Sequence, residues 1–198
     1  MSIKLFRTLG QYGVSVATGD VGAGMAANGE LLQFRWTSTT KLAAIQEISV
    51  TGMRAGTAFA VGNIDLKATV ARAWTAVGSG GTALTLTGDE ATLRTNMGTS
   101  LVGDMRIATT AALTAGTKTL DTQDLGRITT HSSAGWNAAT PIIGSIYLPT
   151  TVLFKADNAA DESPLILNTE EGFVVRATVP ATGVWNLGVT VKWMEVTE

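Results

Sequence analysis

The sequence has no cysteine and only one histidine, His131, among its 198 residues. The lack of cysteine excludes a disulfide framework, a zinc finger and a cysteine nucleophile. A single histidine excludes any site that needs two imidazole rings. Charged residues are also scarce, and the 14 Lys and Arg nearly balance the 16 Asp and Glu, leaving a net charge of -2. A strongly basic surface for nucleic acid is therefore not expected.

Long apolar runs are missing as well. No stretch approaches the roughly 18 apolar residues of a membrane-spanning helix, so a membrane partner is not expected. Near the N-terminus, Lys4 and Arg7 resemble the start of a signal peptide. However, Gly10, Gln11 and Gly13 interrupt the apolar segment that would have to follow. The sequence thus predicts neither a targeting segment nor a membrane span.

Threonine, alanine and glycine are abundant: 31 Thr, 27 Ala and 22 Gly make up 80 of the 198 residues. Threonine favours strands, and glycine permits the tight turns that join them. The length fits one domain, which can bury roughly 70% of its unfolded surface. The mean hydropathy of +0.23 indicates that some apolar surface is left for a partner.

The clearest local pattern lies at the C-terminus. In the segment 184–196, apolar residues alternate strictly with polar or small ones over the nine residues 185–193, which predicts a strand with one buried face. A second alternating segment, 173–179, comes just before it. Pro180, Ala181, Thr182 and Gly183 separate the two and have the composition of a turn. We therefore expect these two strands to form an antiparallel hairpin.

Similar short segments occur along the whole chain. The strands expected from them are 12–17, 32–36, 44–51, 64–75, 82–86, 105–109, 125–130, 146–154 and 165–168. The only expected helix is a two-turn one at 89–96, because Thr87 and Glu90 are spaced like a capping box. The prediction is an all-β protein, a single β-sandwich or jelly roll of about eight to ten strands. Residues 30–198 form the sandwich, and the glycine-rich residues 1–29 form an N-terminal arm or a loosely packed first strand.

Four of the five tryptophans fall on the apolar phase of their predicted strands and are expected in the core: Trp36, Trp74, Trp185 and Trp193. Trp136 differs, because it lies in a Gly-Trp-Asn loop with no apolar phase. It is therefore the candidate for a contact with a partner.

Each candidate motif for catalysis or cofactor binding lacks a part that it requires. Residues 22–27 match a relaxed dinucleotide-binding pattern, but Asn28-Gly29 and a strand follow where the required helix should begin. A catalytic triad would have to use His131, but the sequence contains no G-x-S-x-G nucleophile-elbow motif. The acidic residues Asp157, Asp161 and Glu162 do not have the spacing of a calcium-binding loop. We expect no catalytic residue, no metal and no cofactor.

Two stretches carry a resemblance. The first comprises 81–88 (GTALTLTG), 93–108 (LRTNMGTSLVGDMRIA) and 113–120 (LTAGTKTL). The second comprises 172–183 (GFVVRATVPATG) and 189–193 (VTVKW). Together they resemble structural proteins encoded in the head and tail regions of tailed bacteriophages. The resemblance covers about half of the chain and includes no catalytic motif.

What the resemblance implies is a non-enzymatic virion component, a capsid decoration (cement) protein on the capsid surface, made in the cytoplasm of the bacterial host. Its partners would be the major capsid protein and copies of itself, as a trimer on a local three-fold axis. The candidate contact residues are Leu5, Phe6, Tyr12, Met25 and Trp136. A different class stays open, namely a carbohydrate- or receptor-binding β-sandwich module of a tail or fibre, with exposed aromatic side chains stacking on sugar rings.

Overall fold

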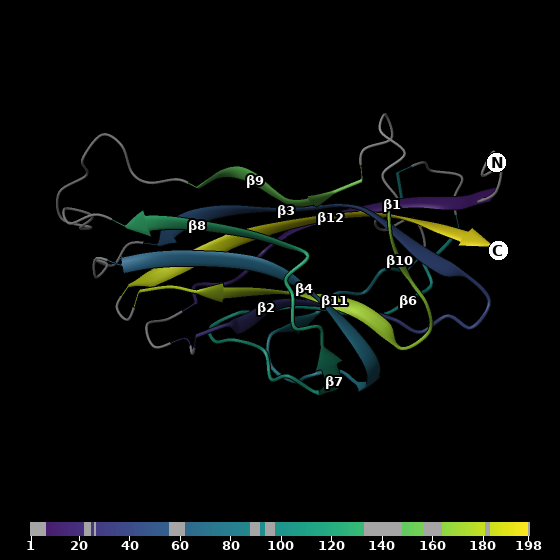
Figure 1. The fold of residues 1–198 in the computed structure, drawn as a ribbon, viewed down its shortest axis with the longest axis horizontal. Helices are drawn as coiled ribbons and strands as arrows, with labels where there is room; N and C mark the ends of the chain where they lie inside the picture. The colour runs from purple at the N-terminus through teal and green to yellow at the C-terminus, as the bar shows by residue number, and fades with distance from the viewer. Residues whose placement is uncertain are drawn as a thin grey trace.

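The computed structural model describes residues 7–21, 25, 27–55, 62–87, 92–93, 98–132, 148–156, 164–180 and 183–197. Within these ranges the protein is all-β, with twelve strands and no helix. The strands form two antiparallel sheets that lie face to face as a β-sandwich (Figure 1). The predicted fold class is therefore confirmed, with more strands than the sequence indicated.

Sheet A has β12 and β3 at its centre. It consists of β1 (Arg7–Ala17), β12 (Val184–Thr197), β3 (Leu42–Ala55), β9 (Leu148–Lys155) and β10 (Leu165–Leu167). The order is β1-β12-β3, and both β9 and β10 pair with the free side of the long strand β3. Strand β1 is consequently an edge strand that pairs with β12 over its whole length.

Sheet B is wider. It consists of β5 (Thr82–Ala83), β6 (Val102–Ile107), β2 (Gly29–Trp36), β11 (Glu171–Thr178), β4 (Gly62–Ala76), β7 (Thr117–Leu120) and β8 (Gly126–Ser132). The order is β5-β6-β2-β11-β4, with β7 and β8 both pairing along the far side of β4.

The pairing is that of a jelly roll. Each of the first four strands pairs with a strand from the second half of the chain: β1 with β12, β2 with β11, β3 with β9 and β10, and β4 with β7 and β8. This folded-back ribbon is then rolled up, so that β12 also pairs with β3 and β11 with β4. Strands β5 and β6 are an insertion that extends sheet B beside β2.

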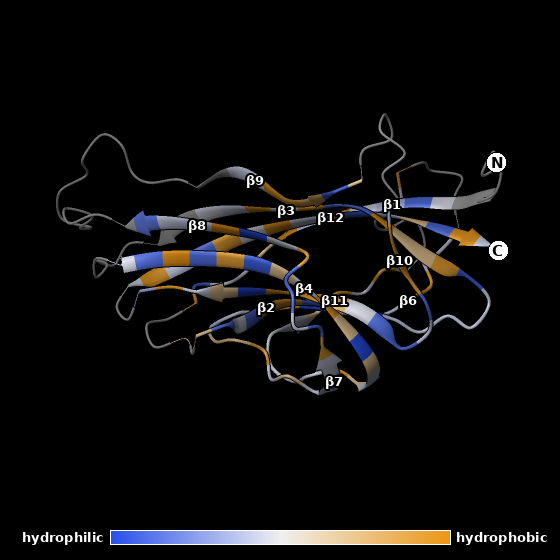
Figure 2. Ribbon diagram, viewed as in Figure 1, coloured by the Kyte–Doolittle hydropathy of each residue, from blue (hydrophilic) through white to orange (hydrophobic). Residues whose placement is uncertain are grey.

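The main core lies between the sheets and is rich in aromatic rings. Phe34 of β2 stacks on Phe173 of β11 at 5.0 Å between ring centroids, and it meets the edge of Trp193 of β12 at 5.3 Å. The two sheets are thus joined by direct aromatic contact. As expected, Trp36, Trp74, Trp185 and Trp193 are all buried. Figure 2 shows the underlying alternation as bands of apolar and polar colour along β4.

The predicted C-terminal hairpin is wrong. Both of its strands exist, but β11 belongs to sheet B and β12 to sheet A, so they do not pair with each other. The connection around Pro180 crosses from one sheet to the other. Alternation predicts a strand and its buried face, whereas the partner is chosen by the rolled-up topology, which alternation does not contain.

Other differences are local. Strand β7 was missed because it is only four residues long and has no clean alternation. The strand expected at 82–86 is shortened to β5. Of the helix expected at 89–96, only Thr92 and Leu93 lie in the described part of the chain, and Thr92 forms an isolated β-bridge with Tyr12. Part of the segment expected as an arm or loose first strand, 7–17, is the regular strand β1.

Candidate functional site

Two of the five predicted contact residues can be placed. Tyr12 is only 2% exposed, and its ring stacks on Trp193 with 5.5 Å between centroids. Its hydroxyl donates a hydrogen bond to the backbone oxygen of Gly98 at 2.9 Å. Burial raises the pKa of Tyr12, and the nearby charge of Glu195 raises it further. Tyr12 is therefore a core residue in the folded chain.

Met25 is half-buried and packs against the same core. The other three candidates, Leu5, Phe6 and Trp136, lie outside the described residues. The sugar platform of the alternative prediction would need exposed aromatic rings, and every tryptophan in the described ranges is buried. Within that part of the chain, nothing resembles a stacking surface for sugars.

The described residues also assemble no catalytic constellation. His131 lies on the exposed side of β8, and its Nδ1 is 2.9 Å from the side-chain oxygen of Asn63, an amide and not a carboxylate. No group of three or more His, Cys, Asp or Glu side chains that could hold a metal ion is found there. Nor does this part of the chain contain a helix able to span a membrane.

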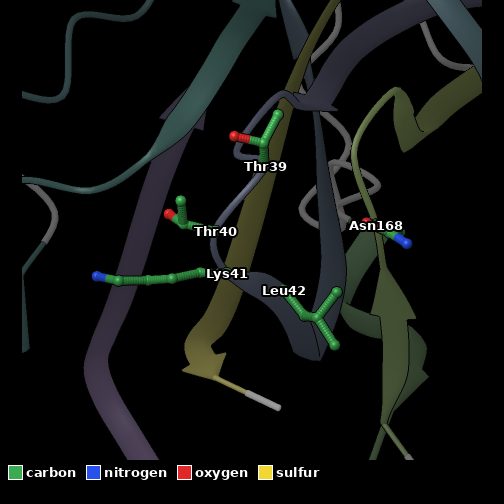
Figure 3. Close-up of a pocket in the computed structure, with 5 residues that line it drawn as sticks. All are labelled: Thr39, Thr40, Lys41, Leu42 and Asn168. Carbon is green, nitrogen blue, oxygen red and sulfur yellow. The ribbon is translucent and has the colours of Figure 1, made fainter.

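The described residues line several surface hollows. One, of about 190 Å³, lies where the turn before β3 faces the segment before β11 (Figure 3). It is lined by Thr39, Thr40, Lys41, Leu42 and Asn168. Ligand sites are usually roughly 300–1,000 Å³ and largely apolar, so this hydroxyl-lined hollow does not suit a sugar ring or a cofactor.

A second hollow, of about 350 Å³, lies between the start of β6 and the chain that follows β5. Leu84, Leu86 and Met105 give it an apolar floor, and threonine and serine side chains form its rim. The backbone N–H of Leu84 donates to the oxygen of Met105 at 2.8 Å, which holds the two walls together. Asp104 also lines this hollow, and its carboxylate is held by Arg35 Nη1 at 3.1 Å.

The most distinctive surface feature is the outer edge of β1. Thr18 donates its N–H to Leu187 of β12, whereas Gly19 donates to Ala108 on the opposite side. Even-numbered residues of this strand thus face β12, and odd-numbered ones face outward. Among the described residues, no group pairs with the outward N–H and C=O groups of Gly13, Ser15 and Ala17.

Other edges in the described chain are protected, as edges of natural sheets usually are. Strands β5 and β10 are two and three residues long. Strand β8 carries Arg127 and His131, and β9 carries Pro149 and Lys155. By contrast, 10–17 (GQYGVSVA) contains neither a charge nor a proline. We call Gly13, Ser15 and Ala17 the open edge.

The fold and this edge define a class: a jelly-roll protein in which the uncharged second half of β1 is available for pairing. No protein-family model matches the chain, and no curated protein matches it either.

Proposed function

We propose that this chain is a non-enzymatic structural protein of a tailed-bacteriophage particle, of the capsid decoration (cement) type, and that it acts as an oligomer joined through β1. The first support is the sequence resemblance, whose segments fall on β5, β6, β7, β11 and β12. The second is the architecture, because jelly rolls are common in viral capsid proteins. A fold alone does not define a function, so the argument depends on a surface suited to assembly.

That surface is the open edge, and it is the observation that carries the proposal. An unpaired strand edge presents alternating donors and acceptors that another strand can satisfy. The occupant we propose is the same edge of a second copy. Two copies of 13–17 placed antiparallel match donor to acceptor, and no charged side chain is brought against its own copy. Sheet A would then run continuously through both copies.

A cement protein stabilises a shell because it binds the assembled state preferentially, so its binding free energy adds to that of the shell. Such a protein needs a rigid body and surfaces that pack closely against others. Interface cores are poor in charged residues, which agrees with the 15% charged composition of this chain. The second partner in this proposal is the major capsid protein, and the place of action is the capsid surface.

The first test is the copy number in purified particles. Quantitative peptide mapping would compare this chain with the major capsid protein. A decoration protein is expected at a ratio near one or a simple fraction of it. A few copies per particle would place the chain in the tail or fibre instead, and absence from the particle would contradict the virion role.

The second test examines dimerisation through the open edge independently of the proposed role in the particle. Ser15→Lys places two lysines close together at the proposed two-fold axis, and like charges facing each other should weaken dimerisation by about tenfold at low salt. Thr190→Lys is the matched control. Its side chain lies on the same face one strand inward, where Thr190 Oγ1 is 2.9 Å from Ser15 Oγ.

Sedimentation or light scattering at several protein concentrations would measure the association. A dimer that dissociates in Ser15→Lys but not in Thr190→Lys supports the edge. A wild-type monomer, or the trimer that the resemblance implies, would contradict the two-fold contact and leave the particle role to the copy-number test.

A further inference from the structure

Three side chains with complementary chemistry meet in a dry place on sheet B. Glu30 and Gln33 belong to β2, and Lys118 belongs to β7, far away in the sequence. Glu30 is 6% exposed, Gln33 is fully buried, and the Lys118 side chain is 2% exposed. Trp74 closes one side, because the Lys118 ammonium lies 4.6 Å from the centre of its ring.

A single carboxylate oxygen joins the other two groups. Glu30 Oε2 accepts a hydrogen bond from Lys118 Nζ at 2.8 Å and another from Gln33 Nε2 at 2.6 Å. The amine and the carboxamide therefore lie on either side of one proton acceptor. Lys118 Nζ also donates to the backbone oxygen of Ala115. Next to that residue, the backbone oxygen of Thr114 accepts the second proton of Gln33 Nε2 at 2.7 Å.

The Gln33 carbonyl is held as well. Its Oε1 accepts the backbone N–H of Gly78 at 3.0 Å. Gly78 is fixed in this place, because a Cβ added to it would approach the Thr114 oxygen to 1.7 Å. A fixed N–H directed at a carbonyl oxygen polarises the carbon, and it stabilises the negative charge that develops on the oxygen when a nucleophile attacks.

Burying a lysine and a glutamate together is costly, because their mutual attraction often does not offset the loss of water. Burial lowers the pKa of Lys118, although the hydrogen bond and charge of Glu30 act in the opposite direction. The environment therefore shifts the amine toward its neutral, nucleophilic form. An ordinary surface ion pair is not buried in this way. It also does not have a carboxamide bound to the same carboxylate oxygen, as Gln33 is bound to Glu30 Oε2.

We propose that Lys118 and Gln33 join in an intramolecular isopeptide bond and that Glu30 carries the proton. Glu30 takes a proton from Nζ, and the free amine attacks Cδ of Gln33. Glu30 then passes this proton to Nε2, the Cδ–Nε2 bond breaks, and ammonia leaves. Glu30 carries a second proton from Nζ to the ammonia, so that an ammonium ion and a neutral Cδ–Nζ amide bond remain.

The atoms balance without another reactant. One ammonium group and one primary amide become one secondary amide and one ammonium ion, and the Glu30 carboxylate is regenerated. No oxidant or cofactor takes part. The fold supplies the orientation, which is worth a large rate factor when both groups are held beside the same carboxylate oxygen.

The bond would join β2 to β7 covalently. The segment around β7 covers the small second core of Trp74, Ala71 and Val174 on the outer side of sheet B. A covalent link would keep this cover in place under mechanical or thermal load. The inference does not depend on the proposed function, and each can fail without the other.

The test is the mass of the full-length wild-type chain, folded, incubated at neutral pH and then denatured for mass spectrometry. The expected mass is lower than that of the sequence by one molecule of ammonia. Trypsin normally cleaves after Lys118, but not once this lysine is an amide. Digestion should therefore yield one branched peptide in which 8–35 is joined to 107–127.

The peptide map also excludes another route to the same mass change. A succinimide at Asn28-Gly29 would also release ammonia, yet it would leave Lys118 open to trypsin. An unchanged mass, or an ammonia loss without the branched peptide, would overturn the proposal.

Single-residue variants test the roles of Glu30 as the proton carrier and Lys118 as the nucleophile. Glu30→Gln keeps the shape but lacks the carboxylate, and Lys118→Met lacks the nucleophile, so both are expected at their full mass. Lys67→Met is the matched control: it removes another lysine of sheet B, whose Nζ is 3.9 Å from Asp124. This control should still lose ammonia. Full cross-linking in Glu30→Gln would contradict the role of Glu30, and the wild-type result is decisive even if a variant does not fold.

Discussion

At the scale of single residues, the ion pair between Glu47 and Lys192 makes stability depend on pH. Lys192 Nζ donates to Glu47 Oε2 at 2.9 Å on the outer face of sheet A. This hydrogen bond lowers the pKa of Glu47 below its ordinary value of 4.5, partly opposed by burial and aided by the charge of Lys192. A carboxyl group whose pKa is lowered by folding stabilises the fold above its unfolded pKa and loses that effect as the pH falls.

Lys192→Met should therefore be less stable than the wild type at neutral pH, by at most about 1 kcal/mol, because the pair is partly exposed to solvent. The difference should shrink as the pH falls below 4.5, where Glu47 becomes protonated in both proteins. Urea denaturation at neutral pH and at about pH 3 would measure it. A difference that stays constant with pH would mean that the lysine contributes by packing alone.

Residue exposure was predictable only where a single strand determines it. The phase of β12 placed Trp185 and Trp193 in the core, and both are buried. Glu195 has the same phase as Trp193 and is fully buried as well, although this burial was not expected from the sequence. Its partners come from elsewhere: Ser100 Oγ and the N–H of Leu101 donate to it at 2.8 and 2.7 Å. Tyr12 was expected to be a contact residue, because nothing near it in the sequence shows that β12 will cover it.

At the scale of elements, alternation predicted the existence of most strands but not their partners. β11 and β12 are neighbours in the sequence and were expected to pair, yet β11 pairs with β2 and β4, and β12 with β1 and β3. A turn of four residues is compatible with a hairpin and with a crossing between sheets. The choice is made by burial, since β11 and β12 each gain a strand on both sides in the rolled-up arrangement.

The same reasoning explains why the candidate site was not visible in the sequence. The open edge of β1 exists because β12 takes one side of the strand and leaves the other unpaired beyond Tyr12. The cluster of Glu30, Gln33 and Lys118 needs β2 and β7 to meet. The lack of charge in 10–17 is the only sequence feature that points to the open edge. It can be interpreted only once the strand is known to lie at the edge of a sheet.

At the scale of the whole molecule, the two ends of the chain complete sheet A together. β1 pairs with β12 from Arg7 with Thr197 to Ala17 with Gly188, so the start of β1 and the end of β12 lie at the same end of the sandwich (Figure 1). Almost every sheet contact joins distant parts of the sequence. The chain therefore loses the entropy of closing long loops before the stabilising contacts form. Folding in milliseconds to seconds is expected for such a topology.

Deleting residues 1–17 should therefore destabilise the entire fold. The deletion removes Tyr12 and the partly buried Val14 and Val16 from the inner face of sheet A. Burial of each such side chain contributes about 1.5–3 kcal/mol, so the loss approaches the total stability of about 5–15 kcal/mol of a domain. Thermal unfolding followed by tryptophan fluorescence would show a much lower midpoint or no cooperative transition. Deletion of residues 1–6 is the matched control, because it leaves β1 complete; equal melting of both truncated proteins would mean that β1 behaves as a detachable arm and not as a strand of the jelly roll.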